Sequence, residues 1–408
     1  MSLEKMFHLK ENNTTVKTEI MAGVTSFMTM AYILAVNPNI LAAAGMDHGA
    51  VFTATAVASF IGTLCMALFA NYPFALAPGM GLNAYFAYTV VLGMGYSWEV
   101  ALAAVLTEGI IFIILSCFNI REAIFNAIPF NLKKAVSVGI GLFITFLGLQ
   151  NAKIVIGGAT LVGLFSVDGY NKTLADGLTA SMSDAGITVL LAIFGVLITG
   201  ILIVKNVKGN ILWGILITWI LGIICQFAGI YIPNPDLGFY NLLPDFSNGI
   251  SIPSLAPIMF KFSLKGVPVL EFIIIVFAFL FVDLFDTLGT LIGVSAKADM
   301  LDSEGRLPRI KGALLADAVG TTCGACLGTS TVTTFVESAS GVTEGGRTGL
   351  TSLTTGILFL LSLFLSPIFL AIPSFATAPA LIVVGFYMIG SVSEIDFKDP
   401  AEGIPAFL

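Results

Sequence analysis

Long apolar stretches follow one another along the whole chain, and polar residues gather in the segments between them. About twelve of these stretches are long enough, or nearly so, to cross the ~30 Å hydrocarbon core of a bilayer as a helix. They cover residues 20–36, 51–70, 75–92, 98–117, 135–149, 188–204, 211–228, 269–291, 313–327, 330–342, 350–365 and 377–389. The pattern predicts an all-α polytopic membrane protein.

One of these stretches, 75–91, contains residues that interrupt a helix. Pro78 prevents a regular helix before it, and Gly79 and Gly81 let the backbone approach other groups closely. Lipid does not tolerate interrupted backbone unless protein buries it or it lines a cavity. A pair of such breaks in matching halves of a membrane protein indicates the binding site of a transporter. We therefore expect a carrier of small molecules.

The matching interruption lies in 328–342. Residues 330–334 are rich in Ser, Thr and Val, which is typical of an extended strand. Five extended residues at ~3.3 Å and nine helical residues, 335–343, at ~1.5 Å add up to roughly 30 Å, or one bilayer crossing. We expect a short strand in each interrupted stretch, with the two strands paired near the middle of the membrane. Each strand should lead into a half-helix whose first turn carries one polar side chain, Asn83 or Glu337.

Composition and charge agree with this picture. A chain of 408 residues that is 57% hydrophobic and only 11% charged is not a soluble globular protein. The net charge of −7 identifies no partner, and no basic cluster indicates nucleic acid. If the N-terminus lies inside and the spans alternate, fourteen of the 18 Lys and Arg residues fall on the inner side. We expect a multi-pass protein of the cell membrane, surrounded by lipid, with a cytoplasmic N-terminus.

Two regions, 20–117 and 269–365, show the same order of spans: two continuous spans, an interrupted one and another continuous one. A short echo accompanies this order, with ATAV and GTLC within 54–65 and ADAV and GTTC within 316–323. The helices predicted between the two regions, 188–204 and 211–228, have apolar centres typical of a scaffold facing lipid. The order predicts an internal repeat, which transporters commonly build in inverted orientation.

Five carboxylates lie inside predicted spans, where ionisable residues are costly and mark functional sites. They are Glu108, Asp283, Asp286, Asp317 and Glu337. Asp283 and Asp286 are three residues apart and so share one helical face. We expect Asp283 to contact substrate or couple proton movement, with Asp286 supporting it; the alternative is that they cap broken helices. Glu108 and Asp317 are equally expected as functional groups or as hydrogen-bond partners between helices.

The two predicted half-helices bring one polar side chain each. Glu337 would lie at the positive end of its half-helix dipole and accept hydrogen bonds from N–H donors of a ligand. The Asn83 amide offers both a donor and an acceptor, and its alternative role is to cap or bridge helices. The Phe335 ring is a candidate for stacking on a substrate or for packing. Asn83 and Glu337 are therefore candidate substrate-binding residues.

Four segments resemble the nucleobase:cation symporter-2 family, and within it the AzgA-like purine permeases. They read TEIMAGVTSFMTMAYILAVNP at 18–38, APGMGLNAYF at 77–86, FVDLFDTLG at 281–289 and GTSTVTTFVESASGVTEGGRTGL at 328–350. The resemblance implies a seven-plus-seven inverted repeat with a core and a gate domain. It implies a symporter and not an enzyme, importing adenine, guanine or hypoxanthine by an elevator-type alternating-access motion. No cofactor is expected, and H+ is the expected coupling ion.

The resemblance also assigns regions and residues. It places the first core repeat at 1–118, the first gate repeat at 119–230, an outer loop at 231–267, the second core repeat at 268–365 and an incomplete second gate repeat at 366–408. The family's purine-binding positions fall on Asn83, Asp283 and Glu337, with Gly81 and Asp286 close by. We expect the proton to be coupled through Asp283, Glu337 or Asp286. The family has fourteen spans, and a thirteenth would begin where this sequence stops, so we expect about twelve. A homodimer is compatible with this family.

Other functions use the same features. An anion carrier of this architecture would need an Arg or Lys deep in a span, and none occurs in the predicted spans. An intramembrane aspartyl protease could use Asp283, Asp286 or Asp317 as a pair of carboxylates sharing a proton, but the Gly-x-Gly-Asp signature of such enzymes is missing. A channel fits interrupted helices with an amide and carboxylates less well than a carrier does. The main hypothesis is a proton-coupled purine carrier.

Overall fold

The computed structural model describes residues 3–118, 130–158, 161–165, 186–233, 239–247, 249, 251–297, 300–302 and 307–407. The chain divides into two compact units. Unit 1 contains Met1–Ser137, Ser251–Ser366 and Ser391–Leu408, and unit 2 contains Val138–Ile250 and Pro367–Gly390. Every candidate site residue predicted above belongs to unit 1.

Unit 1 is built mainly from helices, with two interrupted segments among them. Its helices are α1 (Leu3–Met6), α2 (Val16–Met30), α3 (Ile33–Ala43), α4 (His48–Cys65), η1 (Met66–Ala70), α5 (Met80–Ala84), η2 (Tyr85–Gly93), α6 (Trp98–Cys117), α12 (Val269–Lys297), α13 (Ile310–Leu327), α14 (Ser338–Thr343), α15 (Gly349–Leu361), η5 (Ser362–Leu365) and α18 (Pro400–Phe407). Its strands are β1 (Leu76–Pro78) and β4 (Val332–Thr334).

Unit 2 is a smaller helical body with one β-hairpin. It contains most of α8 (Phe130–Asn151), then β2 (Val155–Gly158), β3 (Leu161–Leu164), α10 (Ile187–Val204), α11 (Asn210–Phe227) and α17 (Ser374–Ile389). Helix α16 (Ser366–Leu370) and η6 (Gly390–Glu394) lie where the chain passes between the units. Strands β2 and β3 pair antiparallel between the predicted spans 135–149 and 188–204, where no strand was predicted, so this hairpin was missed from the sequence.

Eight helices of the described chain are long and apolar enough to cross a membrane. They span Val16–Ala43, His48–Ala70, Trp98–Cys117, Lys134–Asn151, Ile187–Val204, Asn210–Phe227, Ile310–Leu327 and Gly349–Leu370. Helix α12 is longer still, with 29 residues and a length of ~43 Å at ~1.5 Å per residue. The two interrupted spans and the 16-residue α17 are predicted spans that are shorter as helices. The fold is therefore that of a polytopic helical membrane protein, as predicted.

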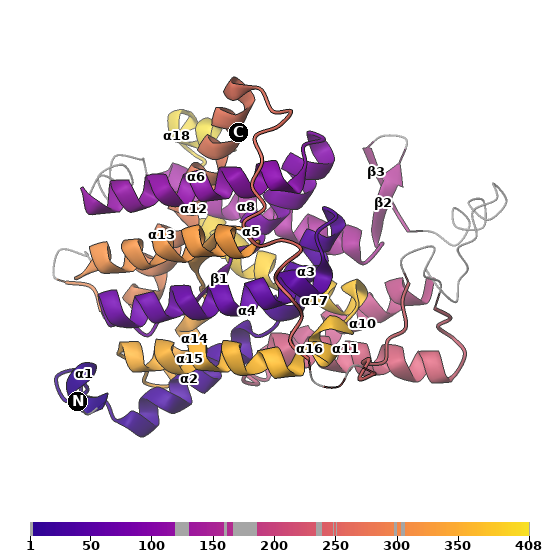
Figure 1. The fold of residues 1–408 in the computed structure, drawn as a ribbon, viewed down its shortest axis with the longest axis horizontal. Coiled ribbons are helices and arrows are strands. Elements are labelled where there is room, and N and C mark those ends of the chain that lie inside the picture. Colours follow the sequence, from indigo (N-terminus) through magenta and orange to yellow (C-terminus); the bar gives the residue numbers. More distant parts are fainter. Residues whose placement is uncertain are drawn as a thin grey trace. The chain divides into compact units, whose positions relative to one another are not determined.

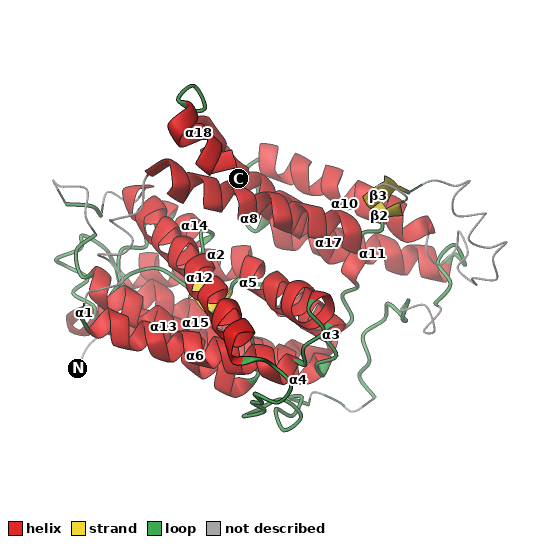
Figure 2. Cartoon of the chain, turned by 90° about the horizontal axis from the view of Figure 1, so that it is seen from above, coloured by secondary structure: helices red, strands yellow, loops and turns green. Residues whose placement is uncertain are grey.

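Four helices of unit 1 lie side by side in the order α6, α13, α4 and α15 (Figure 1). The contact between α4 and α13 is made by glycine: a Cβ on Gly320 would lie 3.2 Å from the Cα of Gly62 and 3.1 Å from Cγ1 of Val332. The two helices approach this closely because neither residue has a side chain. Short strands appear among these helices as yellow segments in Figure 2. Helices α4 and α13 therefore pack directly against the strands of the two interrupted segments.

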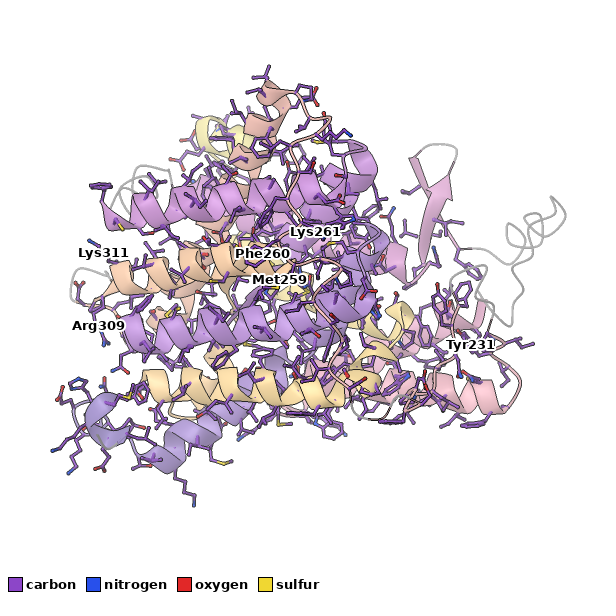
Figure 3. All side chains as sticks on the ribbon, in the orientation of Figure 1. Tyr231, Met259, Phe260, Lys261, Arg309 and Lys311 are labelled. Carbon is purple, nitrogen blue, oxygen red and sulfur yellow. The ribbon has the colours of Figure 1, made fainter. Side chains whose placement is uncertain are left out.

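Basic residues lie near both ends of helix α13 in unit 1. Arg309 and Lys311 lie at its N-terminal end, whereas Met259, Phe260 and Lys261 lie toward its other end (Figure 3). The Phe260 N–H donates to the carbonyl of Cys326 near the C-terminus of the helix, over 2.9 Å. With alternating spans, Arg309 and Lys311 are expected on the inner side of the membrane and Lys261 on the outer side. This orientation stays a prediction.

The bounds of the two units can be set beside those of the predicted core and gate domains. Both predicted core repeats, 1–118 and 268–365, lie in unit 1, and most of 119–230 lies in unit 2. Residues 391–408 were assigned to the gate but pack with unit 1, as do residues 251–267 of the predicted outer loop. Whether the two units act as core and gate in transport stays a prediction.

Candidate substrate site

The two interrupted segments meet as a short antiparallel sheet. Strand β1 pairs with β4, and Ala77 lies opposite Thr333. The Gly79 N–H continues the ladder by donating to the carbonyl of Thr331 over 2.9 Å. Pro78, which has no N–H, faces Val332 at the position between hydrogen-bonded pairs, so its missing donor breaks no ladder bond. The prediction that the two strands pair with each other is confirmed.

Two threonines bond three of the backbone groups that face outward from the sheet. On α4, the Thr63 hydroxyl accepts from Leu76 N at 2.9 Å and donates to Leu76 O at 3.1 Å. On α13, the Thr321 hydroxyl donates to Val332 O at 2.9 Å. Thr63 and Thr321 each follow the glycine at which α4 and α13 touch. The faint GT echo in the sequence therefore has a physical cause: both repeats use it to hold a strand.

Asn83 lies in the first turn of α5, fully buried, as the sequence predicted. Its Nδ2 donates to the carbonyl of Pro78 over 3.4 Å, and its Oδ1 accepts from the hydroxyl of Ser330. The side chain therefore bridges the two interrupted segments, in keeping with the structural alternative. Gly81, on the same short helix, is also buried. Asn83 stays a candidate for substrate contact because it lies at the point where the two segments meet.

Glu337 follows β4 and is the residue immediately before α14. The predicted nine-residue helix from 335 is wrong, because the helix begins only at Ser338 after a turn. The hydroxyl of Tyr32 donates to Glu337 Oε1 over 2.5 Å, and that of Thr29 donates to the Glu337 carbonyl over 3.4 Å. Tyr32 lies in the break between α2 and α3. Sequence reasoning missed it, although a tyrosine within the predicted apolar span 20–36 was visible.

The two aspartates of α12 lie in different surroundings. Asp283 is fully buried, and its Oδ1 lies within hydrogen-bond distance, 2.9 Å, of the Thr287 hydroxyl. Asp286 is partly exposed, and its Oδ2 would be 3.4 Å from a Cβ placed on Gly79. None of the described residues donates a hydrogen bond to Asp286. The sequence placed Asp283 at the substrate with Asp286 behind it, whereas the structure leaves Asp286 the more accessible of the two.

Glu108 and Asp317 connect elements that are far apart in the sequence. Glu108, on α6, accepts a hydrogen bond from the Thr331 hydroxyl just before β4, at 2.7 Å. Asp317, on α13, lies 2.8 Å from the same Thr287 hydroxyl that contacts Asp283. Both are fully buried. Asp317 thus contacts a second helix, α12, whereas Glu108 contacts the interrupted segment before β4; whether either residue also acts in transport stays a prediction.

The remaining candidate, Phe335, is the residue immediately after β4. Its N–H donates to the carbonyl of Ala75 over 3.0 Å, and its side chain is buried. The chemistry of the site is therefore that of an amide, several carboxylates and hydroxyls gathered around a two-stranded sheet. Within the described residues, no group of three His, Cys, Asp or Glu side chains could hold a metal ion. The set is suited to a neutral or cationic ligand that carries N–H donors.

Comparison with known proteins identifies the family. A sequence model of the Permease family matches residues 17–407. The chain is a nucleobase:cation symporter-2 permease. The permease is 44% identical to the guanine/hypoxanthine permease PbuO of Bacillus subtilis, over 99% of this chain and 88% of that protein. It is 40% identical to the adenine permease AdeP of Escherichia coli, over 100% of this chain and 84% of that protein.

The fold of the permease is also found in a solved structure. The transmembrane domain of the cyanobacterial bicarbonate transporter BicA superposes with a TM-score of 0.66, covering 96% of this chain and 97% of that domain. The two sequences are only 17% identical, so this likeness concerns the fold. It supports the predicted seven-plus-seven inverted-repeat architecture. The family model, the relatives named as permeases and the apolar helices together make the chain a multi-pass membrane transporter and not an enzyme.

Proposed function

We propose that this permease imports purine nucleobases, such as adenine, guanine and hypoxanthine, together with protons. The observation that carries this proposal is the donor and acceptor set around the β1–β4 sheet. Asn83, Asp286 and Glu337 come from three elements that meet there. The relatives named as guanine/hypoxanthine and adenine permeases support the choice of purines over other solutes.

The chemistry of a purine matches this set. The base is flat and carries N–H donors beside ring nitrogens that accept, so it needs both kinds of partner along its edge. A carboxylate such as that of Glu337 accepts two hydrogen bonds, and an amide such as that of Asn83 donates and accepts. Hydrogen bonds to an ionised partner are about twice as strong as neutral ones. In this proposal Glu337 and Asp286 accept hydrogen bonds from N–H groups of the base. The Asn83 amide donates to and accepts from the neighbouring edge of the base.

The division into two units supports an elevator-type motion. Asn83, Asp286, Glu337 and their hydrogen-bond partners all belong to unit 1, so one body would carry the whole substrate site. We therefore assign unit 1 as the transporting core and unit 2 as the gate. The permease would act in the cell membrane with its N-terminus in the cytoplasm.

Uptake of labelled hypoxanthine by reconstituted protein tests the proposal. Adenine and guanine should compete with the label, and xanthine and uracil should not; a protonophore should abolish accumulation. Glu337→Gln keeps an oxygen to accept from Tyr32 but removes a carboxylate oxygen, so uptake should fall at least ~10-fold, the loss of one ~1.5–3 kcal/mol hydrogen bond to a charged group.

The matched control for this variant is Glu4→Gln, an exposed carboxylate on α1 that should transport as the wild type does. Uptake by Glu337→Gln equal to that of the control, at equal protein, would refute the role of Glu337. Competition by uracil and not by adenine would refute the purine assignment.

A further inference from the structure

We infer that Asp283 and Asp317 share one proton through the hydroxyl of Thr287, and that this pair holds the proton that moves with the substrate. The inference rests on the proposed function and deepens it, because it places proton coupling apart from the groups that face the purine. It also gives a role to Asp317.

Three oxygen atoms surround the Thr287 hydroxyl. Asp283 Oδ1 lies at 2.9 Å, Asp317 Oδ1 at 2.8 Å and Thr333 Oγ1 at 2.7 Å. Asp283, Thr287 and Asp317 are fully buried, and Thr333 is exposed by only 1%. The cluster therefore joins α12, α13 and β4 away from bulk water.

Counting hydrogens decides the protonation of the pair. A hydroxyl carries one hydrogen to donate and two lone pairs to accept with, and an ionised carboxylate can only accept. If Thr287 donates to Asp283, its contact with Asp317 is a hydrogen bond only when Asp317 carries a proton. The reverse holds if Thr287 donates to Asp317, and both aspartates must be protonated if it donates to Thr333. In every arrangement that gives each of the three contacts a hydrogen of its own, at least one aspartate is protonated.

Electrostatics favours the same state. Two ionised carboxylates that share a small buried volume repel each other, so such pairs hold a proton between them. The helices that pack here carry their Lys and His residues at their ends: Lys297 on α12, Lys311 on α13 and His48 on α4. A pair that shares one proton carries one negative charge and not two. Burying one charge in a dry interior costs less free energy than burying two.

The titratable neighbours of the pair are mostly acidic. Asp286 of α12 interacts electrostatically with Asp317 and with Glu337, which follows β4. Helix α6 adds Glu108, which is held by Thr331 two residues before the cluster. The Cys323 thiol lies on α13 itself. Each acidic neighbour would add to the repulsion if both Asp283 and Asp317 were ionised.

The cluster is in contact with the proposed purine site through β4. Thr333, whose hydroxyl bonds that of Thr287, packs against Gly79, the residue before α5. A Cβ added to Gly79 would lie 2.6 Å from Cγ2 of Thr333 and 3.4 Å from Oδ2 of Asp286. A purine that shifts either interrupted segment therefore changes the position of Thr333 and with it the hydrogen bonds of the shared proton. Coupling between two sites requires such an element whose state both of them bias.

The first test uses Asp317→Asn in liposomes loaded with the pH-sensitive dye pyranine. The Asn amide can donate as a protonated Asp does, so this variant should fold and stay in the protonated-like state. Hypoxanthine exchange should persist, whereas proton influx driven by hypoxanthine and accumulation driven by a pH gradient should be lost. Asp47→Asn, which replaces a helix-capping aspartate by another good cap, is the matched control and should keep both activities.

The outcomes separate the inference from the proposed function. Hypoxanthine-driven proton influx by Asp317→Asn at the wild-type ratio would overturn the inference, and so would loss of exchange in a variant that remains monodisperse. A wild-type protein that neither binds nor exchanges hypoxanthine would instead overturn the proposed function. These results are distinguishable because exchange needs no net proton movement.

A second test removes the bridge and leaves both aspartates in place. Thr287→Val has the same shape but no hydroxyl, so the shared proton loses a hydrogen-bond partner and is held less tightly. The alkaline limb of the uptake profile, along which the pair loses this proton, should therefore shift to lower pH. Thr287→Ser should restore the wild-type profile. Thr218→Val is the matched control, since that buried hydroxyl bonds only a carbonyl of its own helix, at 2.7 Å. A profile of Thr287→Val that coincides with that of the control would overturn the inference.

Discussion

The carboxylate of Glu19, on α2, holds the N-terminal end of α15 and offers a sharp test of how unit 1 is stabilised. Its Oε1 accepts from Arg347 N at 2.9 Å. Its Oε2 accepts from the N–H and the hydroxyl of Thr348, at 3.2 and 2.9 Å, and from those of Thr351, at 3.2 and 2.6 Å. Thr348 and Thr351 are fully buried. An acidic side chain here also faces the positive end of the α15 dipole.

Two replacements of Glu19 should differ in cost. In Glu19→Gln the amide oxygen can face the two threonines, so only the bond to the partly exposed Arg347 N–H is lost, at ~1 kcal/mol, with ~1 kcal/mol more for the lost charge. Glu19→Ala leaves two buried N–H groups without their acceptor, at ~1–3 kcal/mol each, and also loses the charge. We expect a loss of about 2 kcal/mol for Gln and about 4 kcal/mol for Ala.

Thermal stability of the detergent-solubilised protein measures the order of these variants. The temperature of half-denaturation should fall from wild type to Glu19→Gln and further to Glu19→Ala. Amide hydrogen exchange should become faster in peptides that contain Thr348 and Thr351 before it does elsewhere in unit 1. Glu4→Gln is the control because its carboxylate is exposed. Equal stability of all four proteins, or a Gln variant less stable than Ala, would refute this account of the helix end.

Two further predictions follow from single contacts. Tyr32→Phe removes the hydroxyl that donates to Glu337 over 2.5 Å, so the KM for hypoxanthine should rise about 10-fold at nearly constant kcat, for a bond of ~1.5–3 kcal/mol; an unchanged KM would contradict it. Gly349→Ala places a Cβ 2.4 Å from the carbonyl oxygen of Ala67, so the folded yield after solubilisation should fall sharply. The control is Gly139→Ala, which has nothing within 4 Å of the new Cβ and should fold as the wild type does. Equal yields of the two variants would contradict the close packing of α15 on η1.

The spans and their interruptions were predictable from the sequence because both depend on local properties. A bilayer selects about twenty consecutive apolar residues, and this sum can be read along the chain. The breaks at Pro78 and in 330–334 follow equally from residues that do not support a helix. The pairing of the two strands could be expected as well, since backbone groups in a membrane must find partners in the protein.

The start of α14 was not predictable to the residue. The pattern placed helix from 335, but Phe335 remains bonded to Ala75 of the other interrupted segment and the helix begins at Ser338. The Phe335 N–H already has a backbone acceptor in the other interrupted segment, and a helix that began at 335 would break this hydrogen bond. The β2–β3 hairpin was missed for a related reason: its pairing joins residues of a segment that reads as loop.

What the sequence by itself determined is the class of the protein, the position of its spans and the choice of Asn83, Asp283 and Glu337 as candidates. Only the tertiary structure decided the partners of the buried polar groups: Tyr32 with Glu337, 305 residues apart, and Asp317 with Asp283 through Thr287. The physical reason is that hydropathy is a sum over neighbouring residues. A hydrogen bond is satisfied only by an atom about 3 Å away, wherever in the chain that atom originates.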